Sequence, residues 1–369
     1  MNLSGIRKIF LIGDLHLGIK NNSVEWIQIQ KDFLLDFLIK KVDEDFDENR
    51  DILFFEGDIF HSRESINVRV QNEAFEIFKT LSAKFKRGIY IIIGNHDVYY
   101  KDKNEVHSLK SISHLADNIH VFEKPEIIRI NGAHTFLMLP WVEKTEELVR
   151  IIKEHEDICD YIVCHADVKG LRFNKWTKVE HGLELKDLSK YKRVYAGHIH
   201  HRQEQANVLY TGTPYQMDRG DRDNVKGFYE LDVTANKLTE TFIENTNSPT
   251  YKKFDIYDIL EMSPNRICEE FSNSFVDIMI GISVASKFSV TRFLETISKS
   301  THRKIEFFTY VEESKEAQTD LDITSDDQFS VMDIFKKYIK TKDYSKTFKI
   351  SVAKRFFEIH NSVKQQETV

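Results

Sequence analysis

Cysteine and proline are scarce in this chain of 369 residues, which contains three cysteines and five prolines. The cysteines, Cys159, Cys164 and Cys268, are odd in number and form no close pairs. Such a set argues against a disulfide framework and favours a reducing compartment. We therefore expect a cytoplasmic protein in which the cysteines are small buried side chains.

Long apolar runs are also absent. No stretch approaches the roughly 20 apolar residues that a membrane-spanning helix needs, so no membrane association is expected. The segment Ile6–Ile12 is apolar apart from Arg7 and Lys8, and it ends at once in Gly13-Asp14, without a small-residue cleavage site. It is therefore interpreted as a first strand and not as a signal peptide. Hydrophobic residues still make up 41% of the chain, which is enough to form large cores.

An excess of basic residues is missing as well. The chain has 52 Lys and Arg against 59 Asp and Glu, a formal net charge of −7. A simple basic DNA-binding module would look different. Nucleic acid remains possible as a substrate, because a metal site neutralises phosphates locally.

Short apolar runs of strand length alternate with stretches of helical periodicity. Strands buried on both faces are predicted at 8–12, 52–55 and 89–93, with helices between them around 29–38 and 67–86. Further strands are predicted at 127–130, 135–139, 161–163 and 194–196, with a helix around 143–156. The segments 208–211, 227–232 and 238–243 are expected to close the sheet system as an antiparallel run. The predicted fold class is α/β (α+β), with two mixed β-sheets sandwiched between helices.

Glycine usage and charge indicate four regions. Thirteen of the fourteen glycines lie at or before Gly227, so turn-rich structure is expected to end near residue 245. Residues 250–311 suggest a small α+β capping domain. An acidic linker is predicted at 312–327, which holds seven acidic residues and one lysine. Residues 328–369 are predicted to form two amphipathic helices that need a partner surface.

Five polar motifs each follow a predicted strand. They are Asp14-Leu15-His16, Asp58 within Glu56–His61, Gly94-Asn95-His96-Asp97, His165 and Gly197-His198-Ile199-His200. Sites in open α/β sheets lie beyond the carboxyl ends of the strands, so these motifs are expected to meet there.

The residue types in these motifs suit two divalent metal ions. Two ions about 3.5–4 Å apart clamp a phosphate and activate a water. A carboxylate such as Asp58 is suited to bridge them. Imidazole, carboxylate and amide ligands fit Mn, Fe or Zn, and the lack of a thiolate set disfavours a structural zinc site.

Each motif alone has a simpler explanation. A single histidine is more often a surface or packing residue, and Asn-His-Asp is a common turn sequence. The ordered set is what favours a metal site. The remaining histidines are interpreted as surface or packing residues: His107, His114, His120, His134, His155, His181, His302 and His360.

The five motifs resemble those of the calcineurin-like metallophosphoesterase superfamily. Within it, the chain looks like the DNA repair nucleases of the Mre and SbcD type, and especially like the nuclease subunit of the recombination exonuclease of large tailed phages. The segments Asn207–Pro214 and Lys226–Tyr229 add to this resemblance, which covers about residues 8–232. It implies the metallophosphoesterase fold.

The resemblance also implies roles for the site residues. Asp14, His16, Asp58 and His200 would hold one metal ion. Asp58, Asn95, His165 and His198 would hold the other. His96 would act on the leaving-group oxygen or the phosphate, and His61 would orient His96 or contact the phosphate. Protein phosphatases of this superfamily usually have Glu where this chain has Asp97, and Asp-Arg-Gly near His61-Ser62-Arg63, so that branch is disfavoured.

DNA contacts are predicted in the segment 169–178, in which cations alternate with aromatic residues. Its candidate residues are Lys169, Arg172, Lys175 and Trp176. The alternative is a solvated loop with the tryptophan packed beneath it. Arg219 and Arg222 are expected to form a salt-bridged surface with the neighbouring Asp218 and Asp221.

The function implied by the resemblance is that of a Mn-dependent DNA nuclease subunit, with Mg as the other possible metal. The expected activities are a 3′-to-5′ double-strand exonuclease and a single-strand endonuclease. The expected partners are DNA, a second copy of the chain, and an SMC-like coiled-coil ABC ATPase bound through the C-terminal helices. A phage-encoded chain would act in the host cytoplasm. The alternatives are a metallophosphatase acting on phosphomonoesters and a non-catalytic DNA/ATPase scaffold subunit.

Overall fold

The computed structural model describes residues 1–234, 236–311, 339, 352 and 354–356. The chain divides into two compact units, Met1–Val311 and Glu312–Val369. The predicted acidic linker lies outside the described residues, as do all but five positions of the predicted C-terminal helices. Within the described part, no helix has the length and apolar character needed to cross a membrane.

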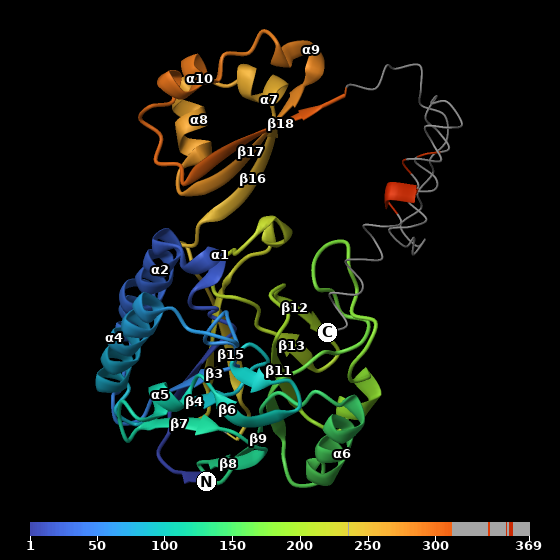
Figure 1. Ribbon diagram of the computed structural model, residues 1–369. Helices are drawn as coiled ribbons and strands as arrows, with labels where there is room; N and C mark the ends of the chain where they lie inside the picture. Colours follow the sequence, from blue (N-terminus) through green and yellow to red (C-terminus); the bar gives the residue numbers. More distant parts are fainter. Residues whose placement is uncertain (235, 312–338, 340–351, 353, 357–369) are drawn as a thin grey trace. The chain divides into compact units, whose positions relative to one another are not determined.

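Two large sheets dominate the first unit (Figure 1). The six-stranded sheet has the order β15-β14-β2-β3-β4-β7, with β2 Lys8–Ile12, β3 Ile52–Phe55, β4 Ile89–Ile92, β7 Ile119–Phe122, β14 Gly227–Asp232 and β15 Thr239–Glu244. The seven-stranded sheet has the order β1-β8-β9-β10-β11-β13-β12, with β1 Asn2–Leu3, β8 Glu126–Ile130, β9 His134–Leu139, β10 Tyr161–His165, β11 Arg193–Gly197, β12 Gln203–Gln205 and β13 Val208–Tyr210. Strands β2, β3, β4 and β7 run parallel, as do β9, β10, β11 and β13.

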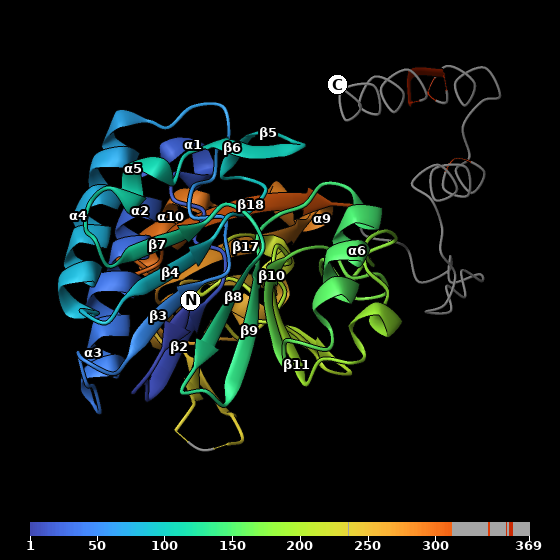
Figure 2. The ribbon, with the colours of Figure 1, turned by 90° about the horizontal axis from the view of Figure 1, so that it is seen from below.

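Helices cover the outer face of each sheet (Figure 2). On one side lie α2 Val24–Lys31, the π-helical turn η1 Asp32–Phe37, α3 Leu38–Asp43 and α4 Val68–Lys84. On the other side lies α6 Thr145–His155. Shorter elements connect these layers: α1 Ile19–Asn22, β5 Val98–Tyr100, β6 Lys103–His107, α5 Lys110–Ser113, and the 3-10 turns η2 Leu185–Leu188 and η3 Arg219–Asp221.

The alternation of side chains along each strand produces this layering. In β2, Phe10 and Ile12 pack with α4, whereas Ile9 and Leu11 face the seven-stranded sheet. In β10, Ile162 and Cys164 pack with α6, whereas Tyr161 and Val163 face the six-stranded sheet. Strands buried on both faces therefore form the centre of two sheets between helices, which confirms the predicted fold class.

The prediction for residues 208–211 was wrong in one respect. Strand β13 does not belong to an antiparallel run with β14 and β15 but lies parallel to β11 in the other sheet. The physical reason is packing, because Val208 and Tyr210 fill the core on the α6 side while Leu209 lies between the sheets. Strand β14 instead pairs antiparallel with β2 and with β15.

Residues 250–311 form a three-stranded parallel sheet in the order β16-β17-β18. Its elements are β16 Thr250–Asp255, α7 Ile256–Leu260, α8 Pro264–Phe271, β17 Ser274–Gly281, α9 Ile282–Ala285, α10 Val290–Thr296 and β18 Lys304–Tyr310. They enclose a separate apolar core. The connection from β15 is tied to the preceding residues, since Asn245 is buried and its side-chain amide donates to Pro214 O across 2.9 Å.

The small sheet is joined to the larger ones by aromatic and ionic contacts. The rings of Trp26 and Phe275 stack with centroids 5.7 Å apart. Arg219 donates to both carboxylate oxygens of Asp277 at 2.7 and 2.8 Å, and Arg222 lies 3.2 Å from the same carboxylate. The two arginines are salt-bridged as expected, but their partners are Asp277 and, for Arg219, also Glu306, and not the neighbouring Asp218 and Asp221. The division of the first unit at residues 245–250 stays a prediction.

Candidate metal centre

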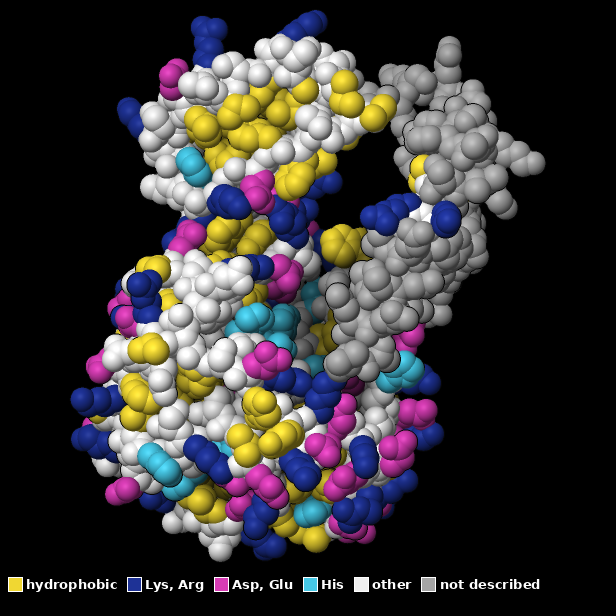
Figure 3. Space-filling view, viewed as in Figure 1, with side chains coloured by type: hydrophobic (Ala, Val, Ile, Leu, Met, Phe, Trp, Pro, Cys, Tyr) yellow, Lys and Arg dark blue, Asp and Glu magenta, His cyan; other side chains and the backbone are white. Residues whose placement is uncertain are grey.

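All five polar motifs meet at the carboxyl ends of parallel strands from both sheets. Asp14, Asp58 and Asn95 follow β2, β3 and β4 of the six-stranded sheet. His165 ends β10 and His198 follows β11 of the seven-stranded sheet. Histidine side chains gather near the middle of the face seen in Figure 3. The site thus lies where the two sheets meet, as the sequence predicts for such sheets.

Three of these residues adopt backbone conformations that are rare for side chains larger than glycine. The φ angles are 50° at His16, 49° at Asp58 and 87° at His198. Each such conformation costs on the order of 1–3 kcal/mol, and such residues cluster at functional sites. The turns hold each other in place, because His16 N donates to Asp58 O across 2.9 Å. Strain of this kind is consistent with side chains that are positioned for a ligand.

A glycine makes the close approach of two of these turns possible. A Cβ atom at Gly94 would collide with Oδ1 and the backbone nitrogen of Asp58. No other residue type fits there unless the backbone and the carboxylate of Asp58 both move. Gly94 is therefore needed for the position of the side chain that is predicted to bridge two metals.

The first donor group comprises Asp14, His16 and His200, whose candidate ligand atoms lie within 4.8 Å of one another. The Nε2 atoms of His16 and His200 are 2.9 Å apart, so both imidazoles face a common point. His16 Nε2 lies 3.5 Å from Asp58 Oδ2. Burial lowers the pKa of His200 to about 4, so this imidazole is neutral and its lone pair is available at neutral pH.

The second donor group comprises Asp58, His165 and His198. Asn95 joins it, because its Oδ1 atom lies 2.9 Å from His165 Nε2 and 2.8 Å from His198 Nδ1. Asp58 Oδ1 is 3.4 Å from His165 Nε2. One Asp58 oxygen therefore faces each donor group, as a bridging carboxylate requires.

The buried charge of the site also fits divalent cations. Burial raises the pKa of Asp14 to about 6, of Asp97 to about 7 and of Glu56 to about 8. For Asp58, burial is the largest single effect and acts in the same direction, but the imidazoles of His165, His16 and His96 together outweigh it and lower the pKa of the carboxyl. Imidazole, carboxylate and amide donors of this kind suit first-row divalent ions, so the residues present fit the predicted metals.

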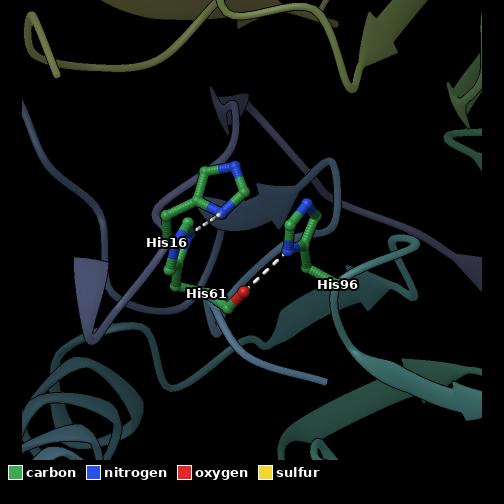
Figure 4. A group of neighbouring side chains, drawn as sticks. All are labelled: His16, His61 and His96. Atoms are coloured by element: carbon green, nitrogen blue, oxygen red, sulfur yellow. Dashed lines mark hydrogen bonds between the residues drawn. The ribbon is translucent and has the colours of Figure 1, made fainter. Parts of the chain in front are cut away.

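Backbone carbonyls fix the orientation of two imidazoles. A carbonyl oxygen only accepts, so His165 Nδ1 must donate to Glu56 O across 2.8 Å, which leaves His165 Nε2 for the site. In the same way His96 Nδ1 donates to His61 O across 2.6 Å (Figure 4). The His96 Nε2 atom is then left for a substrate oxygen.

His16, His61 and His96 form a third cluster at the edge of the donor groups (Figure 4). His61 Nδ1 lies 3.3 Å from His16 Nδ1. The rings of His61 and His96 are nearly parallel, with centroids 5.5 Å apart. Burial, and then the neighbouring His96, lower the pKa of His61. His61 thus contacts His96 through its backbone oxygen and by ring stacking.

Several residues that support the site were not predicted as site residues from the sequence. Asp97 accepts from Gly94 N at 3.0 Å and Phe60 N at 3.1 Å, so it ties two of the site's turns together. Arg63 donates to the backbone oxygen of Asn95 across 2.7 Å. Lys226 donates to the backbone oxygen of His200 across 2.5 Å. The sequence signals were weak: Asp97 closes the Asn95–Asp97 motif, and Lys226 begins a segment that matched the family.

Three of the predicted DNA-contact residues, Arg172, Lys175 and Trp176, lie on a hairpin, and Lys169 precedes it. Arg172 Nη1 donates to Lys175 O across 3.0 Å, and Lys175 forms an ion pair with Asp223. Lys169 is exposed. Trp176 is 74% exposed, which excludes the alternative of a tryptophan packed beneath the loop. Among the cysteines, Cys159 and Cys164 are buried as expected and Cys268 is half-buried.

Comparison with known proteins agrees with this geometry. The family model described as calcineurin-like phosphoesterase matches residues 7–215. Exonuclease subunit 1 of Enterobacteria phage T4 is 34% identical over 301 residues, which cover 76% of this chain and 84% of the relative. DNA double-strand break repair protein Mre11 of Methanocaldococcus jannaschii is 25% identical over 246 residues, 63% of this chain and 64% of the relative. The matched segment contains every predicted metal ligand, and the resemblance predicted from the motifs is confirmed. The chain belongs to the calcineurin-like phosphoesterase family.

Proposed function

We propose that this chain is a metal-dependent DNA nuclease that cleaves phosphodiester bonds. The observation that carries the proposal is the position of Asp58, whose two carboxylate oxygens face two separate donor groups at 3.5 and 3.4 Å. Asp14, His16, Asp58 and His200 would hold one metal ion. Asp58, Asn95, His165 and His198 would hold the other.

Two bound ions would supply Lewis acidity and an activated water at the phosphate. The protein itself supplies the remaining steps. His96 presents Nε2, because its Nδ1 proton is held by His61 O. We propose that His96 acts as the imidazolium, with one N–H held by His61 O, and donates its Nε2 proton or a hydrogen bond to the leaving-group oxygen. The imidazole of His61 stacks against His96 and adds a second donor toward the anionic phosphate.

DNA is proposed as the substrate over a phosphomonoester for two reasons. The relatives are named as an exonuclease subunit and as a DNA double-strand break repair protein. In addition, a hairpin with exposed aromatic and basic side chains borders the recess that contains His198 and His200. A site for small phosphomonoesters has no need of such an extended platform.

Further parts of the proposal concern activity and assembly. We propose Mn as the metal in use, with 3′-to-5′ exonuclease activity on duplex ends and endonuclease activity on single strands. We further propose residues 250–311 as a small capping domain. Residues 328–369 would bind a coiled-coil ABC ATPase, and the active form would be a homodimer in the host-cell cytoplasm. The word subunit in one relative's name supports a larger assembly for that relative.

The test is a gel assay on 3′-labelled duplex, 5′-labelled duplex and circular single-stranded DNA, with Mn, with Mg and with EDTA. Mn-dependent shortening from 3′ ends and nicking of the circle are expected. His96→Ala should abolish cleavage while both metals stay bound, as read by metal analysis of the dialysed protein. His181→Ala, at an exposed position, is the matched control and should cleave normally. Brisk hydrolysis of p-nitrophenyl phosphate with no cleavage of any DNA would favour the phosphomonoesterase alternative. Hydrolysis of neither substrate would favour the non-catalytic scaffold.

A further inference from the structure

Residues 171–179 form a braced β-hairpin, here called the aromatic hairpin, beside the metal centre. Its arms are joined by the bonds from Val179 N to Leu171 O at 2.8 Å and from Phe173 N to Thr177 O at 2.9 Å. Leu171 and Val179, at its base, are buried in the core beneath the seven-stranded sheet. The hairpin is therefore an ordered extension of that core.

Side chains fix its tip and its flank. The Asn174 carboxamide oxygen accepts from Trp176 N and Thr177 N, each at 2.9 Å, which closes the turn. Gln203 Oε1 accepts from Arg172 N across 2.9 Å, and Gln203 Nε2 donates to Arg172 O across 2.5 Å. The polar residues of the hairpin are thus largely used to hold its own shape.

The aromatic side chains of the hairpin are exposed to solvent. Trp176 is 74% exposed and Phe173 is 40% exposed. Burying a ring of this size would stabilise the fold by roughly 1.5–3 kcal/mol, so exposure on a braced hairpin has no structural benefit. The basic side chains of the hairpin, in contrast, already have partners. Arg172 donates to Lys175 O, and Lys175 forms an ion pair with Asp223.

Phe173 connects the hairpin with the site. Its ring centroid lies 6.3 Å from that of His198 in an edge-on arrangement. Phe173 and Asn174 line a recess of about 280 Å³ together with His198 and His200. A group bound in this recess would contact the Phe173 ring on one side and the metal-site histidines on the other.

We propose that Phe173 and Trp176 form a stacking platform for unpaired nucleobases of a DNA strand whose phosphate enters the metal centre. This inference rests on the proposed nuclease function and adds a substrate feature to it. Every nucleobase has a π face, so stacking on aromatic rings is independent of sequence. Bases in a duplex are stacked on each other and do not offer that face. The platform therefore selects strands that are single-stranded, or frayed at an end, next to the scissile bond.

Binding in EDTA tests the platform independently of cleavage. The probes are a fluorescein-labelled oligothymidylate, an abasic oligomer with the same number of phosphates, and a blunt-ended hairpin duplex, measured by anisotropy. Trp176→Ala and Phe173→Ala are each expected to weaken oligothymidylate binding about fivefold or more, and to leave abasic binding unchanged. Trp176→Phe should retain most of the affinity. Lys178→Ala, an exposed cation on the same hairpin, should weaken both single-stranded probes equally.

Intrinsic fluorescence gives a second readout. The chain has three tryptophans, of which Trp26 is buried and Trp141 lies with its ring 5.2 Å from that of His198. Oligothymidylate should quench the wild-type emission more than that of Trp176→Phe, because only the wild type has an indole on the hairpin. Thermal melting of the two Trp176 variants should match the wild type, since Trp176 is 74% exposed, whereas Phe173→Ala should lose a small part of the stability because that ring is 40% exposed.

The results separate the two proposals. If Trp176→Ala and Phe173→Ala bind oligothymidylate as the wild type does, or the wild type prefers the blunt duplex to both single-stranded probes, the platform is overturned even if the protein cleaves DNA. If Trp176→Ala and Phe173→Ala weaken oligothymidylate binding but the wild type with Mn cleaves no DNA, the proposed nuclease function fails. The aromatic hairpin then remains a binding site for single strands.

Discussion

The ammonium group of Lys226 donates to the backbone oxygen of His200 across 2.5 Å, and also to Asp221 Oδ1 at the same distance. Lys226 is only 2% exposed. Burial lowers the pKa of this ammonium, while Asp221 acts in the opposite direction. A buried ion pair therefore holds the backbone that carries one of the proposed metal ligands.

Lys226→Met removes that pair while keeping a similar volume. Because Asp221 would be left buried without its partner, we expect a loss of about 3–5 kcal/mol in the free energy of unfolding, measured with urea. The double variant Lys226→Met with Asp221→Asn should recover part of the loss. Calorimetric titration of the folded variant should also show weaker Mn binding, restored in part by Lys226→Arg. Unchanged Mn affinity would mean that Lys226 has a structural role alone.

Gly94→Ala should remove metal binding without unfolding the six-stranded sheet. The new Cβ atom would displace the turn at Asp58, because both the carboxylate and the backbone nitrogen of Asp58 lie against Gly94. The measurements are metal content after dialysis and circular dichroism. Gly132→Ala is the control, since nothing lies within 4 Å of its Cβ position, although its φ of +72° makes the substitution mildly strained. We expect that control to lose on the order of 1 kcal/mol of stability and no metal.

His61→Ala is expected to reduce kcat less than His96→Ala. The backbone oxygen that orients His96 survives the substitution, and only the ring contacts to His96 and His16 are lost. We expect about a tenfold loss for His61→Ala and about 100-fold or more for His96→Ala. Steady-state kinetics on a short labelled duplex would measure both. Equal losses for the two variants would assign proton transfer to the pair as a unit.

Asp277→Asn should weaken the attachment of residues 250–311 to the larger sheets. The Asp277 carboxylate accepts from Arg219 at 2.7 and 2.8 Å and lies 3.2 Å from Arg222. Arg219 is about half exposed, so solvent screening limits the expected loss to about 1 kcal/mol. Limited proteolysis should show faster cleavage around residues 245–250. Lys186→Ala, which removes an exposed ion pair far along the chain, should leave the digestion pattern unchanged.

Removal of metal should lower the melting temperature of the wild type. A ligand at 100 times its dissociation constant stabilises the folded state by about 2.7 kcal/mol, and the gain is lost in EDTA. Calorimetric melting with and without Mn measures the difference. Asp58→Asn should abolish most of the Mn-induced shift, because its two oxygens face both donor groups. A full shift in that variant would rule out a bridging role for Asp58.

The sequence predicted the sheets and the site for a common physical reason. Apolar runs such as 52–55 and 161–163 are buried on both faces, so they were recognisable as central strands. The polar motifs directly after these strands then had to meet at one edge. This argument placed Asp14, Asp58, Asn95, His165 and His198 together without any knowledge of distances.

Other features depended on contacts between distant residues. Lys226 is buried because it donates to Asp221 and to the backbone oxygen of His200. From the sequence alone, a lysine that follows a loop is expected to be exposed. The two carboxylate partners of Arg219, Asp277 and Glu306, lie 58 and 87 residues further along the chain, whereas the sequence suggested its neighbours. Strand β13 has an alternation that suits either sheet, so its place was decided by packing. The tail beyond residue 311 stays a prediction.

The pairing of β14 with β2 has a consequence during synthesis. The first long strand of the chain acquires its antiparallel neighbour only when residues 227–232 have left the ribosome, and His198 and His200 emerge shortly before. Contacts between segments so far apart in sequence form late in folding. A nascent chain therefore has no complete metal centre until the whole two-sheet body has been translated.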